Sequence, residues 1–376
     1  MIKLICTVFL CLTAWLHIEG QNVEVSGSRI TLSDGNVLGA TFYEGKGLFF
    51  VQQSVLSTET GVRGIRFHRQ LSSWNIKSRS MVLTRAFDKA PEGASVFPCG
   101  RVEVSAKLHR IFLCSAVSHI EVIDPDNLNT VGTMAQGEGQ NINDFAVDDL
   151  HDRLLVLASR SDGTIYFTVY SLLTGNKQQV AFLPATNGRR MSLGYAPQTG
   201  QIGIAIEVGG RTEGKADIYA CSAESSLVCT NIAQADAVSQ ISFLGRQMLV
   251  ATSTFADNKK DCIMAVDLMT RAISRKYCSP STGVHYAVGV VDNRYVVAFT
   301  GVSKRTWFGE ENKSISSTFS VWRDGTSQVV AIAKDPINYG AFQNEMRVVA
   351  SSTEPLFIAY QRISNVLYLF SITEPH

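Results

Sequence analysis

The stretch "DPDNLN" at residues 124–129 bunches side-chain oxygens of the kind that bind calcium or act as catalytic carboxylates. Asp124, Asp126 and Asn127 supply them. A helix-flanked calcium loop also requires a glycine at its sixth position, which is absent here. Asp and Asn also hydrogen-bond their own backbone in turns, where Pro125 would fix φ. We therefore predict a turn between two strands, with no metal and no cofactor.

Other motifs of common enzymes are missing from the chain. There is no G-x-S-x-G nucleophile elbow and no G-x-x-x-x-G-K-[ST] phosphate loop. The histidines scattered through the chain at 68, 109, 119 and 151 suggest exposed polar residues rather than a metal set. The formal net charge is +1, so the basic face that nucleic-acid binding needs is not expected.

The first residues have the pattern of a secretory signal peptide. Lys3 is followed by an apolar run from Leu4 to Leu16, short for a membrane-spanning helix but typical of a signal core. We predict a signal peptide at residues 1–20, with cleavage after Gly20, and a single domain at 21–376. The alternative is an uncleaved anchor. An exported protein, secreted or periplasmic and without a membrane span after processing, follows from the signal.

Six cysteines remain outside the signal, and an even number in an exported chain suggests disulfides. Residues that face each other across a β-hairpin are equidistant from its turn, and three neighbouring pairs have this property. The predicted pairs are Cys99 with Cys114, Cys221 with Cys229, and Cys262 with Cys278. The alternative, free thiols in a reducing compartment, conflicts with the signal peptide.

Seven short segments share one pattern, a turn residue followed by a run dense in Val, Ile, Leu and Phe. They begin at residues 47, 110, 153, 201, 247, 294 and 355. The middle intervals fit the roughly 40 to 50 residues of a four-stranded propeller blade, and the first and last are longer. Alternating strand-like segments flank each run, so each repeat predicts four antiparallel strands, the second of them buried on both faces.

Two of these units carry the sequence features of a known group. "IEVIDPDNLNTV" from Ile120 and "IMAVDLMTRAI" from Ile263 resemble blades of secreted seven-bladed β-propellers of the YVTN and WD-repeat-like group, and "VWRDG" at 321–325 resembles a WD blade ending. The resemblance implies an all-β, seven-bladed propeller of four-stranded antiparallel blades. The last unit has only three strands, so we expect the N-terminal segment Asn22–Leu32 to close it.

Polar residues at the start of the innermost strands would line the mouth of the central tunnel. The ligand-binding candidates there are Asn143, Asp144, Arg190, Gln240, His285 and Tyr286. The alternative is a tunnel that is polar because it contains water. A long insertion offers a second candidate, a partner-binding loop with Arg305, Trp307 and Phe308.

These features predict a non-enzymatic binding or interaction module whose ligand is an unidentified protein, peptide or small molecule. The alternative is a hydrolase of the lactonase kind that uses Asp144, Arg190 and His285 at the tunnel mouth. Convergence of these three side chains on one opening would favour the enzyme. A third hypothesis is a structural envelope protein without a ligand.

Overall fold

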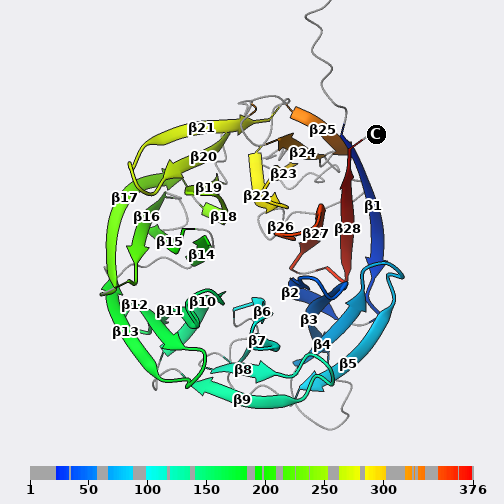
Figure 1. Cartoon of the computed structure of the whole chain (residues 1–376), viewed down its shortest axis with the longest axis horizontal. Helices are drawn as coiled ribbons and strands as arrows, with labels where there is room; N and C mark the ends of the chain where they lie inside the picture. Colours follow the sequence, from blue (N-terminus) through cyan, green and yellow to red (C-terminus); the bar gives the residue numbers. More distant parts are fainter. Residues whose placement is uncertain are drawn as a thin grey trace, which may run out of the picture.

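The computed structural model describes residues 23–33, 35–56, 67–87, 99–116, 119–135, 140–183, 191–196, 199–208, 215–224, 226–236, 238–252, 262–279, 284–301, 318–323, 326, 329–334, 346–362 and 364–374. They form 28 strands in seven four-stranded antiparallel sheets, arranged as a ring (Figure 1). This part of the chain contains no helix long and apolar enough to cross a membrane. The predicted all-β, seven-bladed propeller is confirmed.

The blades follow one another along the chain, each with its first strand at the centre of the ring (Figure 1). Blade 1 contains β2 (Asn36–Tyr43), β3 (Leu48–Leu56), β4 (Phe67–Asn75) and β5 (Met81–Phe87). Blade 2 contains β6 (Val102–Ser105), β7 (Arg110–Ala116), β8 (His119–Ile123) and β9 (Thr130–Ala135). Blade 3 contains β10 (Gln140–Asp148), β11 (Arg153–Arg160), β12 (Ile165–Ser171) and β13 (Lys177–Leu183).

The second half of the ring repeats this order. Blade 4 contains β14 (Met191–Ala196), β15 (Gln201–Val208), β16 (Lys215–Ser222) and β17 (Val228–Asp236). Blade 5 contains β18 (Val238–Leu244), β19 (Gln247–Thr252), β20 (Cys262–Asp267) and β21 (Ile273–Cys278). Blade 6 contains β22 (Val284–Val291), β23 (Tyr295–Gly301), β24 (Thr318–Arg323) and β25 (Val329–Lys334). Blade 7 contains β26 (Met346–Ala350), β27 (Leu356–Gln361), β28 (Val366–Thr373) and, from the other end of the chain, β1 (Glu24–Thr31).

The ring is closed by the pairing of β1 with β28, as predicted. The register runs antiparallel from Glu24 opposite Thr373 to Thr31 opposite Val366. Because β1 occupies the outer position of the last blade, that sheet has the same four-strand width as the others (Figure 1). The closure thereby joins the two ends of the ring without a covalent bond.

The hydrophobic core is divided among the seven interfaces between neighbouring blades, one cluster at each. The second strand of each blade contributes side chains to two of these clusters, one from each face of the strand. In β11, Leu155 and Leu157 pack toward blade 4, whereas Leu154 and Val156 pack toward blade 2. All four are fully buried. The apolar density that marks these strands in the sequence is therefore explained by burial on both faces.

All three predicted disulfides are present. Cys221 lies opposite Cys229 in the register of β16 and β17, with 4.1 Å between their Cα atoms. Cys262 lies opposite Cys278 in β20 and β21, with 3.9 Å between Cα atoms. The bridge from Cys99 to Cys114 ties the segment leading into β6 to β7. Each bond lies within one blade, and those of blades 4 and 5 join two strands of their blade.

Candidate functional site

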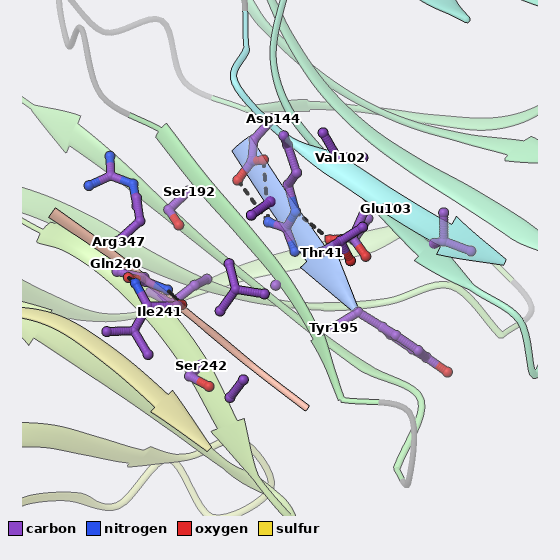
Figure 2. Close-up of a pocket in the computed structure, with 18 of the residues that line it drawn as sticks. Thr41, Val102, Glu103, Asp144, Ser192, Tyr195, Gln240, Ile241, Ser242 and Arg347 are labelled. Carbon is purple, nitrogen blue, oxygen red and sulfur yellow. Dashed lines mark hydrogen bonds and ion pairs between the residues drawn. The ribbon is translucent and has the colours of Figure 1, made fainter. Parts of the chain in front are cut away.

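A cavity of about 760 Å³ follows the central tunnel. The innermost strands of all the blades contribute to its lining, and the lining is rich in polar groups. Figure 2 shows several of these lining residues, among them Asp144, Ser192, Gln240 and Arg347. A volume of this size lies within the range of about 300–1,000 Å³ that is typical of small-molecule sites.

Seven structurally equivalent positions, one in each blade, lie at the same level along the inner edge of the ring. Six of them pair with the fifth residue of the second strand, as Asp144 pairs with Leu157 and Gln240 with Ala251, and Arg101 directly precedes the first paired residue of blade 2. In chain order these positions hold Gly39, Arg101, Asp144, Ser192, Gln240, Ala287 and Arg347. We call this set the tunnel ring. The five polar members line the cavity.

Arg101 and Asp144 form an ion pair that links three blades. The guanidinium Nη1 of Arg101 lies 3.2 Å from Oδ2 of Asp144 and donates to the carbonyl of Leu193 at 2.6 Å. Asp144 Oδ2 accepts the backbone N–H of Leu193 at 2.7 Å. Both backbone groups of Leu193, which lie on the tunnel edge of β14, are therefore satisfied by side chains from blades 2 and 3.

Glu103 completes this network. Its carboxylate lies 2.5 Å from Nε of Arg101. Burial disfavours the charged form of Arg101, but the carboxylates of Asp144 and Glu103 outweigh this effect and raise the pKa of the guanidinium above its ordinary value. Burial also raises the pKa of the Glu103 carboxyl above its ordinary value, and the Arg101 guanidinium partly offsets that increase.

Gln240 makes a similar contact across the tunnel. Its amide nitrogen donates to the carbonyl of Val348 at 2.6 Å, and its amide oxygen accepts the N–H of Val348 at 3.1 Å. Blade 6 lies between the two residues and carries only Ala287 at the same level, which leaves space for the long side chain to pass. The amide thus makes the two hydrogen bonds to Val348 that a neighbouring strand would make, and links blades 5 and 7.

The remaining predicted tunnel residues have different positions. Asn143 lines the cavity, and its amide donates to Ser159 Oγ at 2.9 Å. His285 is fully buried, lies 2.9 Å from the hydroxyl of Thr300 and packs edge-on against Trp322, outside the cavity lining. Tyr286 belongs to β22, but its side chain lies outside the described residues.

The other predicted site residues cannot be compared with the tunnel ring. Arg190 and the loop residues Arg305, Trp307 and Phe308 all lie outside the described residues. They stay predictions. The described part of the chain brings Asn143, Asp144 and Gln240 together around one cavity and does not bring His285 to it.

Three arginines and a serine of the cavity lining were not among the residues predicted from the sequence. They are Arg101, Ser192, Arg347 and Arg362. A signal for two of them existed, because Arg101 precedes the second strand at Arg110 by the same interval as Asp144 precedes Arg153 and Ser192 precedes Gln201. Aligning the repeats on their second strands would have identified these positions.

The acidic stretch at residues 124–129 forms the predicted turn between β8 and β9. The N–H of Asp126 donates to Oδ1 of Asp124 at 2.8 Å, and the N–H of Asn129 donates to Oδ1 of Asn127 at 2.8 Å. His109 of blade 2 lies 2.8 Å from Asp126, and the three groups His109, Asp124 and Asp126 bring possible metal-ligating atoms within 4.8 Å of one another. These contacts fit a hydrogen-bonded turn, and no further observation points to an ion.

Comparison with known proteins concerns the fold alone. No family model and no curated protein sequence matches the chain. The β-propeller domain of Cps50 (Swd1) from Myceliophteria thermophila superposes with a TM-score of 0.57 at 11% identity, covering 92% of this chain and 98% of that domain. Raptor from Chaetomium thermophilum superposes with a TM-score of 0.59 at 12% identity, covering 95% of this chain and 30% of that one. These similarities support the seven-bladed propeller architecture.

Proposed function

We propose that this protein is an exported, non-enzymatic binding module whose ligand occupies the tunnel cavity. The observation that carries the proposal is the cavity of about 760 Å³ with a mixed polar lining at the centre of a closed ring. A rigid scaffold around a polar cavity lowers the entropy lost on binding, because the lining is already ordered. The similarity of this fold to WD-repeat-like propellers supports an interaction role.

Export is the second part of the proposal. Three disulfides are characteristic of an oxidising compartment such as the extracellular space or the periplasm. Residues 1–20, which lie outside the described residues, would act as the signal peptide, and 21–376 would form the mature propeller. N-terminal sequencing of protein recovered from the exported fraction should begin at Gln21, and a chain that still begins at Met1 would contradict this part.

No observation favours the alternative of a hydrolase. The alternative needs Asp144 and His285 at one opening. Asp144 already accepts the N–H of Leu193 and pairs with Arg101, whereas His285 is fully buried next to Trp322. A general base must reach the proton that it removes. We therefore propose binding without catalysis.

The binding proposal can be tested by thermal unfolding of the mature protein with sugars, sugar acids, lactones, metal ions and short peptides. A ligand that binds only the folded state at one hundred times its dissociation constant adds about 2.7 kcal/mol of stability. Ser192→Trp should abolish the shift because it fills the cavity, whereas Ser226→Trp, at an exposed turn of blade 4, should preserve it. A panel without any shift, or a shift that survives Ser192→Trp, would refute the tunnel as the binding site.

A further inference from the structure

The inner strands carry a second set of equivalent residues, three positions beyond each member of the tunnel ring. Each of them pairs with the second residue of the second strand of its blade. In chain order they are Phe42, Val104, Val147, Tyr195, Phe243, Val290 and Ala350. All seven are apolar or aromatic, and all seven line the cavity. We call this set the apolar collar.

The apolar collar is the inner end of the hydrophobic core. Each of its residues belongs to, or packs against, a different one of the seven clusters between blades. The residues two positions earlier are equally apolar and are all buried, namely Ala40, Val102, Phe145, Leu193, Ile241, Val288 and Val348. In the collar only Phe42 and Val290 are buried, and the other five residues are partly exposed. The core therefore reaches the surface of the cavity at this level.

Two hydroxyl groups lie directly beside the collar in the sequence. Thr41 precedes Phe42 on β2, and Ser242 precedes Phe243 on β18; both line the cavity. Neither hydroxyl has a hydrogen-bond partner among the residues that the structure describes. The strands β2 and β18 lie on opposite sides of the tunnel (Figure 1), and Figure 2 shows Thr41 and Ser242 apart from each other. A ligand between these strands can therefore hydrogen-bond to either hydroxyl.

The charged residues from the tunnel ring to the collar have partners within the protein. Arg101 pairs with Glu103 at 2.5 Å and with Asp144 at 3.2 Å, and Arg347 donates to the carbonyl of Met346. The collar itself contains no charged residue. Moving an ionised group from water to apolar surroundings costs far more than moving a hydroxyl that finds a hydrogen bond. The collar therefore suits a neutral ligand better than an ion.

From this arrangement we infer that the tunnel binds a neutral aromatic alcohol of the phenol class, with its ring at the apolar collar and its hydroxyl bonded to Thr41 or Ser242. The inference rests on the proposed function and adds the ligand class. The rings of Phe42, Tyr195 and Phe243 line the cavity and favour offset or edge-to-face contacts with an aromatic ligand. Binding removes the apolar surface of both the ligand and the collar from water, which stabilises the complex.

Calorimetric titration of the mature protein with 2-naphthol at pH 7 tests the inference, because a phenol with a pKa of about 10 is neutral there. Two related compounds separate the contributions. Naphthalene has the same rings without the hydroxyl and should bind at least about fivefold more weakly. In 2-naphthoate an ionised carboxylate replaces the hydroxyl, so this compound should bind at least about tenfold more weakly.

Variants of the lining locate the ligand. Val104→Asp places a charge in the collar and should weaken 2-naphthol at least about tenfold. Val131→Asp makes the same change in the same blade at an outer position that is 49% exposed, and should have no effect. Thr41→Val combined with Ser242→Ala adds no charge, and should bring the affinities for 2-naphthol and naphthalene to within about twofold of each other. This double variant decides the question even if Val104→Asp does not fold.

The outcomes separate the ligand class from the binding function. Tighter binding of 2-naphthoate than of 2-naphthol would overturn the inference of a neutral ligand. Full affinity for 2-naphthol in folded Val104→Asp, or an undiminished preference over naphthalene in the double variant, would overturn the placement at the collar. If 2-naphthol does not bind while a sugar or peptide gives a thermal shift that Ser192→Trp removes, the inference fails and the proposed function stands. If no probe binds at all, both fail.

Discussion

Replacing Asp148 with Asn should destabilise the propeller by about 3 kcal/mol, whereas the same change at Asp292 should cost only about 0–1 kcal/mol. The two carboxylates form the same type of ion pair. In each, Oδ2 accepts Nε of a nearby arginine at 2.8 Å, Arg153 for Asp148 and Arg294 for Asp292, and also contacts Nη2. The pairs differ in burial, and this difference sets the prediction.

The side chains of Arg153 and Asp148 are 11% and 0% exposed, compared with 50% and 21% for Arg294 and Asp292. Removing the charge of Asp148 leaves the buried guanidinium of Arg153 without its anion, and breaking one side of such a pair costs about 3–5 kcal/mol. Asn keeps one acceptor oxygen, so we expect the lower end. At the exposed pair, water replaces the lost contact.

Urea denaturation of the oxidised protein at pH 7, with the wild type and both single variants, measures these free energies. A third protein that carries Asp148→Leu with Arg153→Met should recover much of the loss, because it removes both charges at once. Equal losses for Asp148→Asn and Asp292→Asn would refute the reasoning from burial. So would a double variant less stable than Asp148→Asn.

Three further predictions concern the ring. Burial opposes ionisation of Asp148, but the Tyr195 hydroxyl and the Arg153 guanidinium outweigh it and lower the pKa of the carboxyl. The ionised carboxylate therefore stabilises the fold above about pH 4, and this stabilisation is lost as the pH falls through the lower pKa of the folded state. Below about pH 4 the free energy of unfolding of Asp148→Asn should depend less on pH than that of the wild type, and parallel curves would contradict this. Gln240→Leu leaves both backbone groups of Val348 without the amide and should cost about 1–3 kcal/mol in urea, and an unchanged midpoint would show that the cross-tunnel bond is not stabilising. Gly39→Ala should lower the unfolding temperature strongly, because its Cβ would lie 1.9 Å from a backbone oxygen, whereas Gly132→Ala, with nothing closer than 3.8 Å, should be near neutral; similar effects would contradict the steric argument.

Features decided by neighbouring residues could be predicted from the sequence. The second strand of blade 3 begins at Arg153, where its apolar run begins, because burial on both faces requires apolar residues at successive positions. The pairs Cys221–Cys229 and Cys262–Cys278 follow from spacing alone, since the register of a hairpin is set locally by its turn. Such features need no knowledge of how the ring closes.

The position of His285 shows where this local reasoning ends. The inner strands β10, β18 and β22 each contain a bulge, which changes the face on which later residues lie. His285 precedes the bulge as Val238 does in blade 5, so it corresponds to a buried position, and Ala287 is the residue equivalent to Gln240. The sequence pattern does not show the bulge. The residue predicted to line the tunnel, His285, therefore lies two positions before the equivalent residue, Ala287.

The contacts that shape the site connect blades far apart in the sequence, so no local pattern could have indicated them. Arg101 reaches Leu193 and Gln240 reaches Val348, each past an intervening blade. These bonds pair backbone groups that the innermost strands would otherwise turn toward the tunnel. Stability alone therefore accounts for three polar members of the tunnel ring, Arg101, Asp144 and Gln240. A change at Gln240 should therefore affect the stability of the ring more than the affinity for a tunnel ligand.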